Sequence, residues 1–272
     1  MRILIIGSNG RIGSEIKKQF QEYEILTPPR SVYHAWHSEK KISEIEKYFE
    51  TNKNINGIFI CSGIMNSSKD PSEINKVNYL LPKNIIKSVK SKYTKIVLFG
   101  TVMELIAAGS TEYVKSKQRL QDFLNQECKH KKILSLKIHT VYGGLPPNNY
   151  MFLGQILESI KSLKNFKMSS GNQLREYHHV EDLVYAIKHL YKKDVYGIVD
   201  ISTGQSIRLK DLATSIFTYF GKHNLLKLGA IKDNNLENYS YTLPRHSLTK
   251  NLKFRDAKNG IIEYLKENLD SF

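Results

Sequence analysis

Short apolar runs alternate with amphipathic helical patterns through the first half of this chain, and this alternation constrains the fold more than any other feature. Helical patterns are expected near residues 11–22, 42–52, 82–92 and 112–129. Strands that alternate with helices in this way usually form parallel sheets with crossover helices. The sequence therefore predicts an α/β fold, a Rossmann-type doubly wound parallel sheet. The strand-like runs are "RILIIG" (2–7), "EILT" (24–27), "GIFICS" (57–62), "KIVLFG" (95–100) and "ILSLKIHTVYGG" (133–144).

The second half breaks this rhythm. The loop "GGLPPNN" (143–149) is rich in glycine and proline, and a helix is expected near 152–163 after it. A further helix (180–191) and strand (197–202) follow. We expect a dinucleotide-binding core over 1–142 and a smaller carboxy-terminal lobe over 143–272, mainly for substrate, with elements near 180–202 returning to the core.

Composition excludes several functional classes. The 272 residues carry a net charge of +15, but the lysines are scattered and no aromatic-interleaved basic stripe appears, so no nucleic-acid partner is expected. The chain has no apolar run long enough to span a membrane and no signal-peptide core, so no membrane association is expected. Cys61 and Cys128 lack metal or disulfide spacing, which predicts no metal site and a reduced cytoplasmic location.

A glycine-rich loop follows the first apolar run. "GSNGRIG" places Gly7, Gly10 and Gly13 between a strand and a helix. Glycines there allow a tight turn and let backbone N–H groups approach a pyrophosphate at the helix amino terminus. The motif alone is weak, and an ordinary strand-to-helix turn is the alternative. Its strand–loop–helix context at the start of the chain favours a dinucleotide site.

The end of the second strand should indicate the cofactor. NAD-binding proteins usually place an acidic residue there to hold the ribose hydroxyl, whereas an arginine accommodates the 2′-phosphate of NADP. After "EILT" the chain reads "PPRS", with Arg30 and no acid, and Arg11 adds a second cation. We therefore expect NADP, with NAD as the alternative; an ordinary exposed loop arginine is the structural alternative.

The motif Tyr-x-x-x-Lys occurs twice, at Tyr79–Lys83 and Tyr113–Lys117. In a chain so rich in tyrosine and lysine, about two matches arise by chance. Pro82 lies inside the first, so a helix should include Lys83 only near its first turn and leave Tyr79 outside. The second has no breaker, and its spacing puts both side chains on one helical face.

Tyr113 and Lys117 suit proton transfer. A phenol with a pKa of about 10 is a poor acid–base catalyst at neutral pH. A nearby ammonium and a nicotinamide cation should lower that pKa. Thr101, at the carboxyl end of "KIVLFG", can hydrogen-bond the same substrate oxygen. The expected catalytic residues are therefore Thr101, Tyr113 and Lys117.

Over nearly its whole length the sequence resembles the extended short-chain dehydrogenase/reductase group, also called NAD-dependent epimerase/dehydratases. The resemblance implies an enzyme acting on a nucleotide sugar, in bacterial surface-polysaccharide biosynthesis, and a homodimer. The residues that carry it are "GSNGRIG", "CSG", Asn78 in "VNYLLPKNII", "FGT", "YVKSK", "IHTVYGG", "REYHHVEDLVYAI" and "GIVDISTGQSIRLKDLA".

The resemblance and the glycine-rich loop together imply which residues form the site. Arg175 is implied to contact the substrate diphosphate, although spacing alone would also allow a solvated cation, and His179 is implied to be structural. The expected substrate-binding residues are Thr101, Val102, Met103, His139 and Arg175. The expected cofactor-binding residues are Gly7, Asn9, Gly10, Arg11, Ile12, Gly13, Arg30, Cys61, Ser62, Gly63, Asn78, Tyr113, Lys117 and Thr140.

The chain also departs from the family pattern. The segment between Thr101 and Tyr113 is shorter than the usual loop, and Lys137 and Ile138 replace the usual Arg-Pro. Val102 and Met103 stand where sugar 4,6-dehydratases carry an acidic pair, and the cysteine of epimerising reductases is missing.

The missing acidic pair favours a keto-sugar reductase, and Arg30 favours NADP as its cofactor. The alternatives are an NAD-dependent nucleotide-sugar epimerase and a non-catalytic dinucleotide-sensing regulator.

Overall fold

The computed structural model describes residues 1–65, 70–107, 111–127, 131–234 and 237–270. The chain groups into two compact units, each built from two separate stretches. The first comprises Met1–Ile138 and Val184–Asp200, and the second comprises His139–Leu183 and Ile201–Phe272. None of the helices in the described ranges is long and apolar enough to cross a membrane.

The first unit contains a six-stranded sheet in the order β10-β5-β4-β3-β1-β2, in which every pairing is parallel. Parallel neighbours need crossover connections, and helices supply them here. The predicted doubly wound α/β sheet is thus confirmed. Its strands are β1 (Arg2–Ile6), β2 (Glu24–Leu26), β3 (Ile55–Ile60), β4 (Lys95–Thr101), β5 (Ile133–Ile138) and β10 (Gly197–Asp200).

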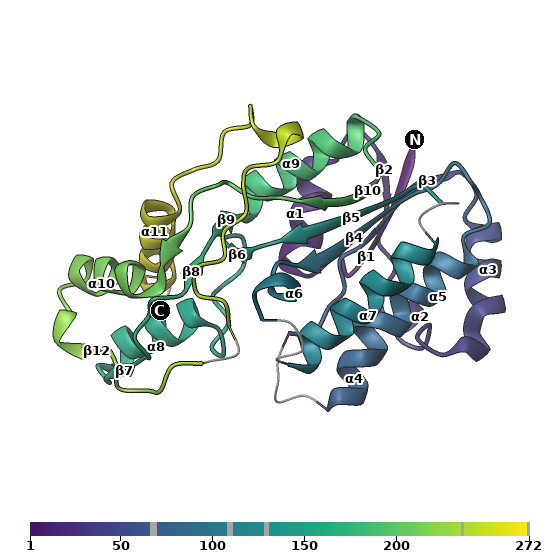
Figure 1. Cartoon of the computed structure of the whole chain (residues 1–272). Helices are drawn as coiled ribbons and strands as arrows, with labels where there is room; N and C mark the ends of the chain where they lie inside the picture. The colour runs from purple at the N-terminus through teal and green to yellow at the C-terminus, as the bar shows by residue number, and fades with distance from the viewer. Residues whose placement is uncertain (66–69, 108–110, 128–130, 235–236, 271–272) are drawn as a thin grey trace. The chain divides into compact units, whose positions relative to one another are not determined.

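Helices cover both faces of this sheet (Figure 1). On one face Leu4, Ile58 and Leu98 join an apolar cluster with side chains of α3, α5 and α7. On the other, the Phe59 ring meets Phe20, after α1, and Tyr191 of α9, with centroids 5.1 and 5.2 Å apart. Successive side chains along a strand point to opposite faces of the sheet, so a continuous apolar run makes both faces apolar. The helices are α1 (Arg11–Gln19), α2 (Arg30–Tyr33), α3 (Ile42–Thr51), α4 (Pro71–Asn75), α5 (Leu81–Ser88), α6 (Met103–Ile106), α7 (Glu112–Glu127) and α9 (Val180–Lys192).

The strand order reverses between β1 and β3, because β2 follows β1 outward on one side while β3, β4 and β5 continue on the other. In doubly wound sheets ligands bind beyond the carboxyl ends of the strands at such a reversal. The loop after β1 and the loop after β3 meet at this point. This geometry positions the candidate site.

A buried lysine fastens the carboxyl end of α9 to the sheet. Lys95, the first residue of β4, has only 5% of its side chain exposed. Its ammonium donates a hydrogen bond to the Tyr191 carbonyl (3.1 Å) and lies 5.0 and 4.8 Å from the ring centres of Tyr191 and Tyr196. A cation suits the carbonyl end of a helix, so Lys95 holds α9 in place.

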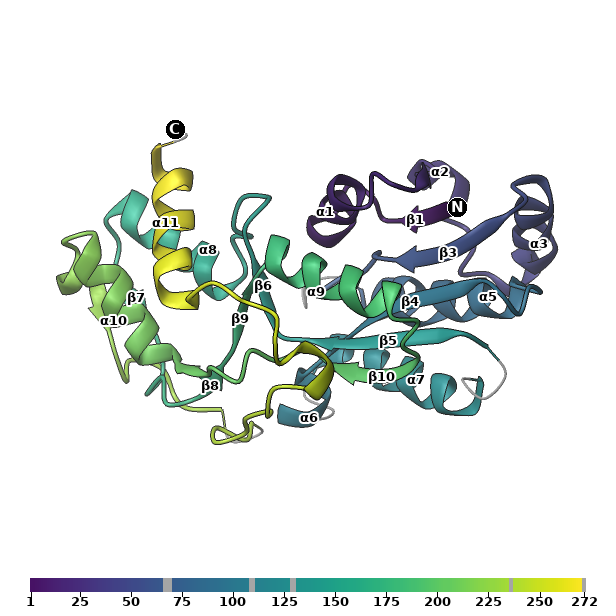
Figure 2. The same cartoon turned by 90° about the horizontal axis from the view of Figure 1, so that it is seen from above.

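The second unit is a smaller α/β body with its own apolar core (Figure 2). Leu153, Leu212 and Ile261 join this core from its three long helices. The helices are α8 (Phe152–Ser162), α10 (Leu209–Tyr219) and α11 (Ala257–Asp270). Short strands pair as β6 (Thr140–Tyr142) with β9 (Tyr177–His179), β8 (Leu174–Arg175) with β11 (Ile207–Arg208), and β7 (Phe166–Lys167) with β12 (Leu226–Lys227).

Two sequence-based expectations were wrong in detail. The run 133–144 is not one strand, because it crosses between the units after Ile138 and continues as β6, which pairs with β9. Tyr79 is not outside helical structure, because Lys76–Leu80 forms a π-helical turn that leads directly into α5. α5 begins at Leu81, and Pro82 lies in its first turn, where proline is tolerated, so the helical path is not ended there. Cys128 lies outside the described residues.

Candidate dinucleotide and catalytic site

The glycine loop folds tightly against both β1 and β3. Gly7 has φ +83°, a left-handed conformation that favours glycine, and its carbonyl accepts the Gly10 N–H at 3.1 Å. A Cβ at Gly13 would lie 2.3 Å from the Gly7 carbonyl oxygen. Both positions therefore require glycine for steric reasons, and α1 packs directly on the loop.

The amino terminus of α1 suits an anion. Gly10 is the N-cap and has no side chain to cap the helix. The first turn begins with Arg11 and Ile12 and carries no carboxylate, and Asn9 lies exposed just before it. The backbone N–H groups and the dipole of a helix amino terminus together favour a phosphate. The expected loop residues thus fit a pyrophosphate.

The loop after β3 lies against the glycine loop. A Cβ at Gly7 would be 2.7 Å from the backbone nitrogen of Ser62 and 3.0 Å from the carbonyl carbon of Cys61. Burial raises the pKa of the Cys61 thiol, which disfavours the thiolate form. Cys61, Ser62 and Gly63 therefore place main-chain atoms at the point where the strand order reverses.

Asn78 holds that loop in place. Its buried side-chain amide accepts a hydrogen bond from the Ile64 N–H and donates one to the Ile64 carbonyl, each at 2.8 Å. The same amide nitrogen contacts the Ser116 hydroxyl of α7 at 3.1 Å. Asn78 therefore ties the loop that carries Gly63 to the helix that carries Tyr113 and Lys117.

Arg30 opens a one-turn helix instead of lying in an irregular loop, and its side chain is exposed. Three residues later, Tyr33 is half-buried and makes a hydrogen bond with the Gly7 backbone; burial nevertheless raises the pKa of its phenol. The sequence analysis missed Tyr33. Its i, i+3 spacing from Arg30 was the available signal, because that spacing puts both residues on one face of a helical turn.

Thr101 and Tyr113 are in direct contact. The Thr101 hydroxyl forms a hydrogen bond with the phenol of Tyr113, which lowers its pKa, but burial outweighs this and raises the pKa of Tyr113 to about 12. The lowered pKa expected from a neighbouring ammonium is therefore not found in the protein by itself. The phenol is held as a neutral proton donor at neutral pH.

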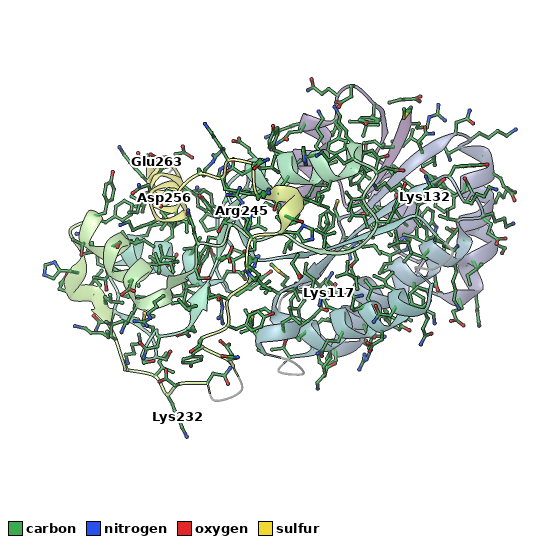
Figure 3. The ribbon with its side chains drawn as sticks, turned by 45° about the horizontal axis from the view of Figure 1, so that its top comes forward. Lys117, Lys132, Lys232, Arg245, Asp256 and Glu263 are labelled. Atoms are coloured by element: carbon green, nitrogen blue, oxygen red, sulfur yellow. The ribbon has the colours of Figure 1, made fainter. Side chains whose placement is uncertain are left out.

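Lys117 lies one helical turn beyond Tyr113 on α7. Figure 3 labels its side chain. Its ammonium donates a hydrogen bond to the Phe99 carbonyl of β4 at 2.7 Å. Burial lowers the pKa of Lys117 to about 8, and the carboxylate of Glu104 opposes that shift. The chain thus brings Thr101, Tyr113 and Lys117 together at the carboxyl end of β4.

The two residues after Thr101 offer no proton. Val102 is buried, and its N–H donates to the Ile138 carbonyl at 3.1 Å; Met103 is half-buried at the start of α6. Glu104 folds back and accepts a hydrogen bond from the Thr101 N–H at 3.0 Å. The sequence reasoning above gave Glu104 no role.

Three expected site residues belong to the second unit. The His139 ring stacks on His178 with centroids 5.7 Å apart, and the Thr140 N–H donates to the Glu176 carbonyl at 3.2 Å. Arg175 forms an ion pair with Glu237. A cavity of about 740 Å³ in this unit is lined by Leu174, Thr203, Gly204, Gln205, Ser206, Thr242, Leu243, Pro244 and Arg245.

Comparisons with known proteins agree with this geometry. The family model described as NAD dependent epimerase/dehydratase matches residues 3–202. A search of curated protein sequences found no match. No group of three or more His, Cys, Asp or Glu side chains that could hold a metal occurs in the part of the chain that the structure describes.

Solved structures with the same fold include several enzymes. A dTDP-4-dehydrorhamnose reductase from Clostridium acetobutylicum is 19% identical, with TM-score 0.77, covering 98% of this chain and 99% of that one. The Bordetella bronchiseptica enzyme WbmG in complex with NAD is 18% identical, with TM-score 0.79, covering 100% and 94%. DesIV, a dTDP-glucose 4,6-dehydratase from Streptomyces venezuelae, is 13% identical, with TM-score 0.80, covering 100% and 99%.

The family match covers most of the chain, and the similar structures span nearly all of it. The resemblance inferred from the sequence is confirmed. This chain belongs to the NAD-dependent epimerase/dehydratase family of NAD(P)-dependent oxidoreductases and epimerases.

Proposed function

We propose that this chain is an NADP-dependent reductase of a keto-sugar that is linked to a nucleotide. The observation that carries the proposal is the hydrogen-bonded pair of Thr101 and Tyr113, in which burial keeps the phenol protonated. Ketone reduction needs one proton donor at the carbonyl oxygen, and this pair provides it. The bound nicotinamide supplies the hydride.

The residues of the first unit have separate roles in binding and in the reaction. Tyr113 protonates the substrate oxygen, and Thr101 donates a second hydrogen bond to that oxygen. Lys117 orients the cofactor ribose from the same helical face. The glycine loop and the amino terminus of α1 hold the pyrophosphate, supported by the backbone of the loop after β3.

The preference for NADP rests on Arg30. It is exposed at the fourth position after β2, in a segment that offers no carboxylate for the ribose hydroxyl. Its planar guanidinium can bind a 2′-phosphate with two parallel hydrogen bonds. Tyr33 fixes the helical turn that carries Arg30 against the Gly7 backbone.

The nucleotide-sugar substrate is supported by similarity and by Arg175. Similar structures include an enzyme named for a dTDP-linked keto-sugar and a complex with UDP-glucose and NAD. Arg175 is only 12% exposed and is the guanidinium we assign to the diphosphate. Polar lining residues such as Thr203 and Gln205 give the adjoining cavity hydrogen-bonding groups for a nucleotide.

Dehydration is disfavoured by the groups after Thr101. Loss of water from a sugar needs a base and an acid in addition to the redox centre. Val102 and Met103 carry no ionisable group. Glu104 already accepts the Thr101 N–H and lies 3.8 Å from the Lys137 ammonium. Reduction requires only the proton of Tyr113.

The test is a panel of GDP-, dTDP-, UDP- and CDP-linked 4-keto-6-deoxysugars with NADPH, followed by cofactor absorbance and product mass. We expect consumption of NADPH with at least one member and no reaction with the parent nucleotide-hexoses. A keto-deoxysugar formed from a plain nucleotide-hexose would overturn the proposal. Interconversion of two sugar epimers with tightly retained NAD would identify an epimerase instead.

A further inference from the structure

Glu104 is a carboxylate buried beneath the candidate catalytic residues. Only 4% of its side chain is exposed. Burying a carboxylate is costly unless hydrogen bonds and cations compensate. The surroundings of Glu104 provide both, and they include two of the three residues to which we assign catalysis.

The first relationship is a reciprocal cap on Thr101. Glu104 accepts the Thr101 N–H at 3.0 Å, while the Thr101 hydroxyl oxygen accepts the Met103 N–H at 3.2 Å. The two hydrogen bonds are reciprocal like those of a capping box, but they lie one residue before Val102, the N-cap of α6. The same hydroxyl interacts with the Tyr113 phenol, so it is held between the Met103 N–H and that phenol.

The strand before Thr101 leaves room for this arrangement. A Cβ at Gly100 would lie 3.0 Å from Glu104 Oε1, closer than most real contacts of a Cβ. A side chain at residue 100 would therefore push the carboxylate away from the Thr101 N–H. Gly100 and Glu104 fit together at the carboxyl end of β4.

The second relationship is between Glu104 and the charged groups that surround it in the protein interior. The Lys137 ammonium lies 3.8 Å from Glu104 Oε2, with 12% of the lysine side chain exposed. Burial raises the pKa of Glu104, and Lys137 and Lys117 oppose that shift, while Asp200 adds to it. Two cations and two carboxylates thus share one poorly solvated region, in which their charges interact strongly.

We propose that Glu104 is a positioning residue, which orients the hydroxyl of Thr101 and keeps the side chain of Lys117 in its ammonium form. The inference rests on the roles proposed above for Thr101 and Lys117. Glu104 makes no direct contact with the reacting atoms and acts through these two residues. Without its charge, the buried Lys117 loses the carboxylate that opposes its desolvation.

The main test is Glu104→Gln, because glutamine can still accept the Thr101 N–H but carries no charge. NADPH affinity, measured by fluorescence between about pH 6 and pH 10, reports the charge of Lys117 without requiring turnover. We expect the wild-type affinity to fall with a midpoint near pH 8 and the variant midpoint to lie about one unit lower. Between the two midpoints the variant should bind up to about tenfold more weakly.

Glu112→Gln is the matched control, because Glu112 begins α7 on the surface and pairs with Lys115. Its pH midpoint should match that of the wild type. An unchanged midpoint in folded Glu104→Gln would overturn the electrostatic part of the proposal. The readout is cofactor binding, so it remains decisive even if the keto-sugar panel is silent.

Glu104→Asp tests the other part and does not depend on Glu104→Gln being folded. Aspartate keeps the charge but is too short to reach the Thr101 N–H. We expect the wild-type pH midpoint together with faster hydrogen exchange at the Thr101 amide and a lower turnover number. Unchanged exchange at that amide would contradict the positioning role.

Discussion

Arg175 and Glu237 form a half-buried ion pair in the second unit, with 12% and 15% of their side chains exposed. In this pair the Glu237 carboxylate already binds the Arg175 guanidinium, which we assign to the substrate diphosphate. A phosphate and a carboxylate are both anions that bind a guanidinium, and here Glu237 Oε2 contacts Nη2 of Arg175. We therefore expect the binding of a nucleotide to displace Glu237.

We expect Glu237→Gln to tighten the binding of UDP or dTDP by up to about tenfold, because a neutral amide competes less well for Arg175. Isothermal titration calorimetry gives the dissociation constants directly. Glu263→Gln removes the same charge from an exposed position on α11 and should leave them unchanged. Weaker binding of UDP or dTDP by Glu237→Gln would contradict the assignment of Arg175 to the diphosphate site.

Tyr113→Phe should fold and bind cofactor normally but lose about 100- to 10,000-fold in turnover, because only the phenolic oxygen can donate the proton. Steady-state kinetics and NADPH fluorescence measure the two properties separately. Tyr79→Phe is the control, because Tyr79 belongs to the other Tyr-x-x-x-Lys match. Near-normal turnover of Tyr113→Phe would leave Tyr113 without a part in the reaction.

Arg30→Asp should weaken NADPH binding and reduce or reverse the preference over NADH. The change removes the cation expected to face the 2′-phosphate and introduces the carboxylate expected to bind a ribose hydroxyl. Fluorescence titration with both cofactors measures the preference. Arg30→Lys keeps the charge but loses the planar fork, so its affinity should be intermediate. A wild-type preference for NADH would refute the assignment of Arg30.

Lys95 should make stability depend on alkaline pH. Burial lowers the pKa of Lys95 to about 8, with Lys132 adding to this and Asp194 opposing it. Between about pH 8 and pH 10 the unfolded chain holds a proton that the folded chain has released, so stability should rise with pH. Lys117 contributes in the same direction.

The measurement compares denaturant midpoints of the wild type and Lys95→Met at about pH 7.5 and pH 9.5. The rise in stability should be smaller in Lys95→Met, since the variant has no ammonium to deprotonate. Lys92→Met, at an exposed position before β4, should behave as the wild type. An equal rise in the stability of Lys95→Met would show that another group titrates in this pH range.

The sequence predicted the sheet and the glycine loop because both depend on local patterns. Apolar runs of strand length and the spacing of Gly7, Gly10 and Gly13 are visible without any tertiary contact. The helix-breaker argument against Tyr79–Lys83 was wrong, because the helical path continues through Pro82. The roles assigned to these residues stay predictions, whereas the fold and the family are confirmed.

Contacts between distant parts of the chain were not predictable in this way. The pairing of Glu104 with Lys137 depends on β4 and β5 lying side by side with a register that periodicity does not reveal. The raised pKa of Tyr113 depends on burial by several elements at once. The break after Ile138 was hidden because residues on both sides of it have strand-like composition.

The discontinuous first unit has a consequence for synthesis on the ribosome. When the first 138 residues have emerged, β5 has no partner on its outer side, because β10 follows the intervening stretch His139–Leu183 and the helical residues from Val184 onward. The Phe59 face likewise lacks Tyr191 until then. An unpaired strand and an uncovered apolar face are what promote aggregation of nascent chains. A fragment ending at Ile138 should therefore be insoluble, and productive folding of this sheet must wait until Asp200 has left the exit tunnel.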